Sequence, residues 1–274
     1  MIKALKQFIR DHLFIKKIIP LEIPVYTGKL LTDKIALIIG GSGGIGFAIA
    51  KAFVASGAKV VITGTHQEKL VAMCNELGDG CARYVVSDVT KVAEIDEMVK
   101  CAVGKFGKID ILVYSAGVHC KEPFGRISES TWDNVLDVNL KGMYFTCQSI
   151  ADYMIKNNIK GHILTISSAS SAKPGWTPYE ISKHGAKALT LGFADKLIQY
   201  GIVVNGIAPG PVATNMLNRG GMDDVYWPGN PTGRMSTPSE MANWAVFLVS
   251  DIGNMVVGDT FYISGGSGTI CLDK

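Results

Sequence analysis

Short apolar runs alternate with longer stretches of helical periodicity from residue 34 almost to the end of this chain. Each run is rich in β-branched or aromatic residues, as strands buried on both faces are. This alternation predicts βαβ units, whose parallel strands form one sheet with helices on both faces. The expected strands are residues 35–39, 59–63, 82–87, 109–114, 162–167, 202–207 and 260–263. We therefore expect a doubly wound α/β domain with a seven-stranded parallel sheet.

Composition excludes several classes of protein. With 274 residues, 47% of them hydrophobic, the chain can bury a large core, and a single domain is expected. A net charge of +3, without a basic run interleaved with aromatic residues, gives no sign of a nucleic-acid partner. No apolar run reaches the roughly 18 residues needed to span a bilayer. Six cysteines occur singly and the histidines are not clustered, which favours a reducing cytoplasm and no metal site.

Two segments stand apart from the alternation. Apolar and basic residues recur at helical spacing over residues 1–19, so residues 1–32 are expected to be an amphipathic extension of the main domain, residues 33–274. The favoured interpretation is a helix packed on its own domain; a membrane surface and the active site of a neighbouring subunit are alternatives. Residues 213–238, rich in Gly, Pro, Asn and Asp, are expected to be a binding loop in which Met216 and Trp227 contact a ligand.

A glycine-rich segment follows the first expected strand and precedes a helical pattern. Glycines let the backbone approach a phosphate, and the N-terminus of the helix offers unpaired N–H groups. Two glycine registers fit: Gly41, Gly43 and Gly46, or Gly40, Gly44 and Gly46. The segment predicts a Rossmann-type fold that binds a dinucleotide. Its expected contacts are Gly40, Ser42, Gly43, Gly44, Ile45 and Gly46.

The end of the second expected strand bears on which dinucleotide is bound. An acidic residue there would hold the adenosine ribose of NAD, but the chain has Gly64, Thr65 and His66. Thr65 and His66 can donate hydrogen bonds to a 2′-phosphate, although the sequence places no Arg or Lys to pair with it. The sequence therefore favours NADP, with NAD as the alternative.

Tyr179 and Lys183 lie one helical turn apart in a segment that runs to Ile198. An ammonium about 4 Å from a phenol, at an effective dielectric near 20, contributes about 4 kcal/mol. That energy lowers the pKa of the phenol by up to about 3 units, so Tyr179 is expected to titrate near neutral pH. Ser168, at the carboxyl end of a strand, is placed to hold a reacting oxygen, and Asn139 to hold a relay water behind Lys183.

These motifs, in this order, resemble the classical short-chain dehydrogenase/reductase family over about residues 31–266. The remaining signals are Asp88-Val89 after the third strand, Ser115-Ala116-Gly117 after the fourth, and Ala208-Pro209-Gly210 with Thr214. The resemblance implies an NAD(P)-dependent alcohol dehydrogenase or ketoreductase that transfers a hydride between a nicotinamide and a carbonyl or secondary alcohol. It also implies a homo-oligomer, usually a tetramer.

The resemblance assigns roles to single residues. Tyr179 is similar to the family's acid or base and Lys183 to the partner that lowers its pKa and binds the nicotinamide ribose. Ser168 resembles the anchor of the substrate oxygen, and Asn139 the holder of a relay water. Trp176 and Met216 are expected to contact substrate as well. The remaining implied cofactor contacts are Asp88, Val89, Ala116, Gly117, Pro209, Gly210, Val212 and Thr214.

Three departures from the family pattern are visible. Ile39 stands where the family has Thr, and Tyr114-Ser115 where it has two Asn residues, so hydrogen bonds that brace the central strands are missing or altered. The interval from Ser168 to Tyr179 is short, which leaves Ser167 as an alternative hydroxyl.

Several alternatives stay open. A nucleotide-sugar epimerase or dehydratase shares the Tyr and Lys, and a catalytically silent dinucleotide-sensing protein shares the glycine loop. His119 and Cys120 are candidates for substrate contact or for an ordinary loop, whereas His184 points away from the Tyr and Lys. The identity of the substrate is not encoded in any motif.

Overall fold

A computed structural model of the chain describes residues 28–217 and 225–270. The amphipathic helix expected over residues 1–19 lies outside the described residues and stays a prediction. The same holds for the part of the expected binding loop between residues 218 and 224.

The described residues contain the predicted seven-stranded parallel sheet. Its order is β3-β2-β1-β4-β5-β6-β7, so the chain winds outward from β1 in one direction and then returns to wind outward in the other. Every strand lies where the apolar runs predicted it, with ends that differ by at most two residues. The strands are β1 (Ile35–Ile39), β2 (Lys59–Gly64), β3 (Ala82–Val86), β4 (Ile111–Tyr114), β5 (His162–Ile166), β6 (Val203–Pro209) and β7 (Thr260–Ile263).

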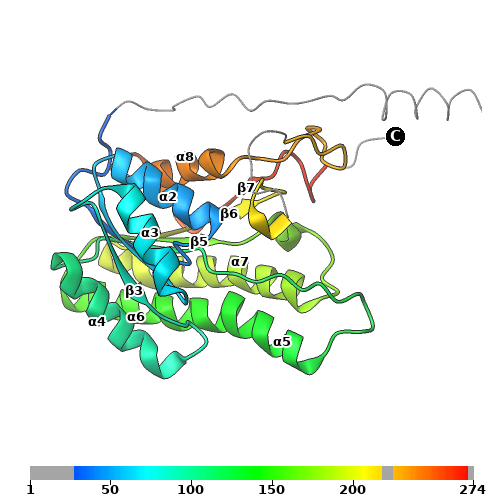
Figure 1. Cartoon of the computed structure of the whole chain (residues 1–274), viewed down its shortest axis with the longest axis horizontal. Helices are drawn as coiled ribbons and strands as arrows, with labels where there is room; N and C mark the ends of the chain where they lie inside the picture. Colours follow the sequence, from blue (N-terminus) through cyan, green and yellow to red (C-terminus); the bar gives the residue numbers. More distant parts are fainter. Residues whose placement is uncertain (1–27, 218–224, 271–274) are drawn as a thin grey trace, which may run out of the picture.

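Helices cover both faces of this sheet, as Figure 1 shows. On one face lie α2 (Gly44–Ala55), α3 (Gln67–Leu77) and α8 (Pro238–Leu248). On the other lie α4 (Ile95–Phe106), α6 (Gly142–Lys156) and α7 (Pro178–Leu197), with α5 (Glu129–Leu136) packed against α7. Shorter helical turns connect these elements. They are η1 (Val92–Glu94), the π-helical η2 (Asp137–Lys141), η3 (Ala169–Ala172), η4 (Ile198–Tyr200), η5 (Asn215–Leu217) and η6 (Asp251–Gly253).

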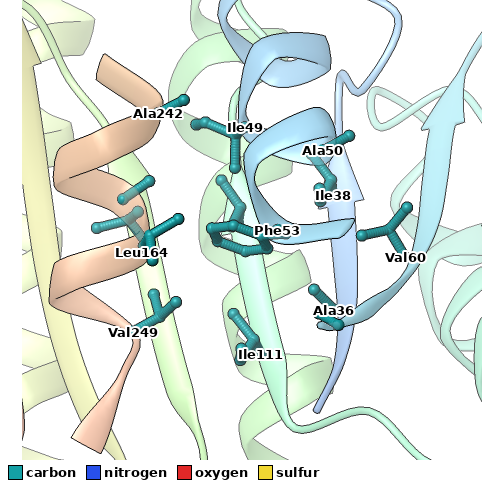
Figure 2. Close-up of a cluster of buried hydrophobic side chains, with 14 of the residues drawn as sticks. Ala36, Ile38, Ile49, Ala50, Phe53, Val60, Ile111, Leu164, Ala242 and Val249 are labelled. Carbon is teal, nitrogen blue, oxygen red and sulfur yellow. The ribbon is translucent and has the colours of Figure 1, made fainter. Parts of the chain in front are cut away.

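The core has two layers because successive strand residues point to opposite faces. Ala36 and Ile38 belong to the layer under α2 and α8, whereas Leu37 and Ile39 belong to the layer under α4, α6 and α7. Figure 2 shows the first layer, where the fully buried ring of Phe53 lies among side chains of the sheet and of α8. A side chain of this size, fully buried, contributes about 1.5–3 kcal/mol to folding.

The carboxyl ends of the parallel strands meet at one edge of the sheet, where open α/β sheets bind their ligands. The glycine loop follows β1, Thr65 follows β2, Ala116 follows β4 and Ser168 follows β5. No helix in the described ranges is long and apolar enough to span a membrane.

Candidate active site

A cavity of about 680 Å³ runs along the carboxyl edge of the sheet. This volume lies within the range of small-molecule and cofactor sites. Most of the predicted cofactor contacts line it. They are Gly40, Ser42, Gly43, Gly44, Ile45, Thr65, Asp88, Val89, Ala116, Gly117, Tyr179, Lys183, Pro209, Gly210, Val212 and Thr214.

The glycine loop forms a cradle with an open helix N-terminus. Gly43 precedes α2 without a side-chain cap, and the first turn of the helix has no acidic residue. The first N–H groups of a helix have no partner within it, so they are available to an anion. Gly40 has a φ of +72°, and a Cβ there would lie 2.6 Å from the amide nitrogen of Ala116. The residues present therefore fit the pyrophosphate of a dinucleotide.

Two glycines of the loop serve packing instead. A Cβ at Gly41 would lie 2.7 Å from the Cβ of Ile62, and one at Gly46 would collide with the carbonyl oxygen of Gly40. Neither residue lines the cavity, so the predicted direct contact of Gly46 with the cofactor is not seen in this structure. A glycine is required at position 46 because the first turn of α2 lies directly against the main chain of Gly40.

The end of β2 holds a residue that sequence reasoning missed. Thr65 lines the cavity as predicted, but His66 does not, because its ring turns to the Thr65 hydroxyl at 2.9 Å and stays exposed. Lys69, in the first turn of α3, lines the cavity near Thr65. The expectation that no Lys is placed at this end is therefore wrong. Lys69 follows Thr65 by one helical turn, and this spacing is the sequence feature that could have identified it.

Tyr179, Lys183 and Ser168 meet in the cavity. Ser168 hydrogen-bonds the phenol of Tyr179. The ammonium of Lys183 is buried, donates to the carbonyl oxygen of Ile166 at 3.1 Å, and lies 5.7 Å from the centre of the Tyr179 ring. A proton-transferring phenol, a second hydroxyl and a cation thus share one site.

The electrostatics of this set differ from the expectation. Burial raises the pKa of Tyr179, and the hydrogen bond from Ser168 opposes that shift only in part. Burial also lowers the pKa of Lys183 to about 8. The predicted fall of the Tyr179 pKa toward neutrality is not seen in this structure, because burial disfavours the charged phenolate. Tyr179 keeps its proton at neutral pH, as an acid must.

The two serines after β5 have separate contacts. The hydroxyl of Ser167 donates to the main-chain oxygen of Lys183 at 2.9 Å and so ties α7 to the sheet. Ser168 interacts with Tyr179 instead and accepts a hydrogen bond from the amide of Ser170. The geometry favours Ser168 as the hydroxyl beside the reacting oxygen.

Asn139 does not line the cavity, and its side chain makes hydrogen bonds to other protein groups. It is fully buried in η2, where its side-chain nitrogen donates to the Val118 carbonyl and to the Ser182 hydroxyl, both at 3.0 Å. Its oxygen accepts from the Val118 amide at 2.8 Å. Because both N–H donors are used, the side chain braces the loop and α7; it does not donate to a relay water. A second lone pair of its oxygen stays available.

A hydrogen bond from Tyr114 takes the place of those that brace the central strands in the family pattern. The Tyr114 hydroxyl donates to the carbonyl oxygen of Val138 at 2.6 Å, at the point where η2 departs from α-helical geometry. The departure from the family pattern therefore alters the hydrogen bonds between β4 and the helix; it does not remove them.

The structure also gives the positions of four further candidate residues. The ring of His119 packs against the ring of Tyr179 with centroids 4.5 Å apart, and His119 lines the cavity, whereas Cys120 is buried away from it. His184 donates to the carbonyl of Lys173 at 2.7 Å, away from the catalytic set as predicted. Trp176 does not line the cavity: it precedes the first residue of α7 and is 53% exposed. The structure thus does not support a substrate contact by Trp176.

The described part of the expected binding loop borders the cavity. Met216 and Trp227 both line it. A bridge between Val212 and Ser236 closes the base of the loop, and Trp227 packs on a small apolar cluster formed by Ala213, Val225 and Met235. The loop is therefore anchored on the cavity side by its own apolar residues.

Comparison with known proteins decides the family. The family model described as short chain dehydrogenase matches residues 34–223. The chain belongs to the short-chain dehydrogenase/reductase family. It is therefore an NAD(P)-dependent oxidoreductase of the alcohol dehydrogenase or ketoreductase type.

Curated relatives and solved structures match nearly the whole length of this short-chain dehydrogenase. Gluconate 5-dehydrogenase from Gluconobacter oxydans is 34% identical, over 84% of this chain and 93% of its own. Galactitol 2-dehydrogenase from Agrobacterium fabrum is 33% identical, over 86% and 98%. The crystal structure of a short-chain type dehydrogenase/reductase from Mycobacterium marinum superposes with a TM-score of 0.81 and 29% identity, covering 88% of this chain and 97% of that one.

Proposed function

We propose that this enzyme interconverts a carbonyl group and a secondary alcohol with Tyr179 as the proton-transferring residue. The observation that carries the proposal is the meeting of Ser168, Tyr179 and Lys183 in one cavity beside the uncapped glycine loop. When bound, the nicotinamide supplies or accepts the hydride at the reacting carbon.

The side chains have distinct tasks in this proposal. Ser168 and Tyr179 donate hydrogen bonds to the carbonyl oxygen and orient it. In reduction, the phenolic proton of Tyr179 passes to that oxygen, and oxidation is the reverse of this transfer. The ammonium of Lys183, 5.7 Å from the ring centre, stabilises the phenolate that reduction leaves behind. Asn139 holds the loop at Val118 and the start of α7 in register, through Val118 and Ser182.

Replacement of Tyr179 by Phe tests this assignment. The Tyr179→Phe enzyme should bind the dinucleotide as the wild type does but lose turnover by on the order of 100- to 10,000-fold, the range for general acid catalysis. Fluorescence titration with NADPH and NADH measures binding, and cofactor absorbance measures turnover. Gluconate and galactitol, named in two relatives, are the first alcohols to try. Retained turnover would contradict the role of Tyr179.

NADP is the proposed cofactor, with NAD as the alternative. Lys69 and Thr65 line the end of the cavity that follows β2, whereas Glu68, in the first turn of α3, does not line it. The ammonium and hydroxyl favour a 2′-phosphate. Lys69→Met should weaken NADPH binding about tenfold and leave NADH binding unchanged, whereas Lys156→Met, at an exposed site on α6, should change neither. Tighter binding of NADH than of NADPH by the wild type would favour NAD.

Assembly and location are also proposals. We expect a homo-oligomer, a tetramer or dimer, which light scattering measures directly. The cysteines of the described residues are free, in keeping with a reducing cytoplasm. A nucleotide-sugar epimerase or dehydratase, and a silent dinucleotide-binding protein, are the alternatives. Tight cofactor binding without net hydride transfer on any alcohol or ketone would favour one of them.

A further inference from the structure

Charges are unevenly distributed along the cavity. Among its described lining residues, Asp88 is the one carboxylate, whereas Lys69, Lys173 and Lys183 are cationic. Asp88 and Lys69 follow the neighbouring strands β3 and β2, on the half of the sheet where the adenosine of a dinucleotide would lie. Lys183 belongs to the catalytic set. Lys173 remains as a cation with no part in the proposed chemistry.

Lys173 is held in the substrate half of the cavity. It directly follows η3, the turn that leads away from Ser168, and its main-chain oxygen accepts a hydrogen bond from His184 at 2.7 Å. Its ammonium donates to the Ser267 hydroxyl at 3.3 Å. A Cβ at Gly268 would lie 3.0 Å from the Lys173 side chain, so the segment after β7 packs directly on its stem. The position of the ammonium is thus fixed from two sides.

This ammonium has no opposite charge within the described ranges. The ion pairs found there involve other lysines and Arg234, and Lys173 has a neutral hydroxyl as its partner. Ser267 lines the cavity beside it, and Ser170 also lines the cavity. A fixed ammonium with a neighbouring hydroxyl is suited to the oxygens of a carboxylate or phosphate.

We infer that Lys173, with Ser267, binds an anionic group of the substrate, so that the enzyme acts on carbonyl compounds or alcohols bearing a carboxylate or phosphate. The inference rests on the proposed function, because it takes Ser168 and Tyr179 as the reacting end. The two ends are separated by η3. At about 2 Å per residue, the α-carbons of Ser168 and Lys173 lie about 10 Å apart. The anionic group therefore lies several bonds from the reacting carbon.

A matched series of ketones tests the inference. The acids 3-oxobutanoate, 4-oxopentanoate and 5-oxohexanoate move the carboxylate away from the ketone stepwise, and their methyl esters remove its charge. Dihydroxyacetone phosphate, compared with dihydroxyacetone, tests a phosphate in the same way. For wild-type enzyme we expect kcat/KM to be higher for anions than for their neutral partners, and to favour the longer acids.

Variants at Lys173 assign the preference to its charge. Lys173→Met should lower kcat/KM for the preferred anion on the order of 10- to 100-fold, the contribution of one charged hydrogen bond, and change the neutral partner less than about threefold. Lys173→Arg should keep most of the preference, and Ser267→Ala should reduce it slightly. Lys156→Met, which removes the same charge from an exposed site on α6, should have no effect. NADPH titration of each variant reports an intact fold.

Three outcomes overturn the inference and one concerns the proposed function. Equal kcat/KM for anions and neutral partners, or a preference that survives Lys173→Met, would show that Lys173 does not select the substrate. Failure to reduce any anion while neutral ketones are reduced would do the same. If ketones are reduced equally well by the Tyr179→Phe enzyme, the proposed function fails instead.

Discussion

Helices α2 and α7 both begin at the carboxyl edge of the sheet, but they begin in opposite ways. Gly43, before α2, offers no side-chain cap, and no acidic residue occupies the first turn. Thr177, before α7, forms a capping box with Glu180, and Pro178 occupies the first helical position. Such a box satisfies N–H groups of the helix with the helix's own side chains.

The difference shows how one edge of the sheet can both bind a ligand and position a catalytic residue. The open N-terminus of α2 keeps its N–H groups for an anion, so its stability depends on the sheet beneath it. The closed N-terminus of α7 fixes the helix whose second residue is Tyr179, and keeps the phenol aligned with Ser168. Ligand binding and catalysis thus need opposite solutions at equivalent helix ends.

A side-chain cap at the N-terminus of α2, like the one at the N-terminus of α7, should produce the largest effect, a loss of cofactor affinity. The φ of Gly43 is −82°, so Gly43→Asp requires no left-handed backbone, and its carboxylate would cap the helix. The same carboxylate would lie where the pyrophosphate binds. Repulsion of two unit charges about 4 Å apart costs about 4 kcal/mol, so the Kd for NADPH should rise on the order of 1,000-fold.

The control for that change separates charge from capping. Gly43→Asn also caps a helix but carries no charge, and should weaken NADPH binding much less. Chemical denaturation should show both variants at least as stable as the wild type. Unchanged NADPH affinity in Gly43→Asp would contradict the assignment of α2 as the phosphate site.

Burial of Lys183 in α7 should produce an effect of about 3 kcal/mol on stability. Its folded pKa of about 8 lies below the value of 10.5 for a free lysine, so between these pH values the unfolded chain binds one more proton. Folding stability from this group therefore rises with pH across that window, by about 1.36 kcal/mol per unit.

Urea unfolding at matched pH values measures this dependence. Between pH 8 and 10.5 the free energy of unfolding of the wild type should rise by about 3 kcal/mol relative to Lys183→Met, and below pH 8 the difference should be constant. A difference that stays flat across the window would mean that the ammonium of Lys183 is solvated in the folded protein.

Removal of the side-chain cap from the N-terminus of α7 should produce the smallest effect, a small loss of stability and of kcat. Thr177→Ala removes the cap and should cost about 1 kcal/mol of stability. Because Tyr179 would be held less firmly, kcat should fall while the Kd for NADPH stays the same. Thr177→Ser keeps the hydroxyl and should behave like the wild type. A changed Kd for NADPH with unchanged kcat would show that the cap serves the cofactor.

The sequence predicted the sheet and the motifs well because both depend on local pattern. The central strands β1, β4, β5 and β6 are fully buried apolar runs, whereas the edge strands β3 and β7 are only partly buried. Buried apolar runs differ plainly from amphipathic helices. Ser168, Tyr179 and Lys183 were recognised from their spacing on one strand end and one helix face. The glycine loop was recognised in the same way, although only the structure shows that Gly46 serves packing.

The features that the sequence did not predict depend on tertiary contacts. The raised pKa of Tyr179 follows from burial by residues distant in the chain, which no spacing encodes. Lys69 reaches the cavity through the placement of α3. The side chain of Tyr114 spans from β4 to η2, which a comparison of motifs registers only as a missing Asn.

Equilibrium titration of the wild-type protein with NADPH and with NADH tests the central claim most directly. The open N-terminus of α2 and the cavity along the sheet edge predict saturable binding of a dinucleotide, tighter for NADPH, in the absence of any substrate. A folded protein that binds neither dinucleotide would contradict the account.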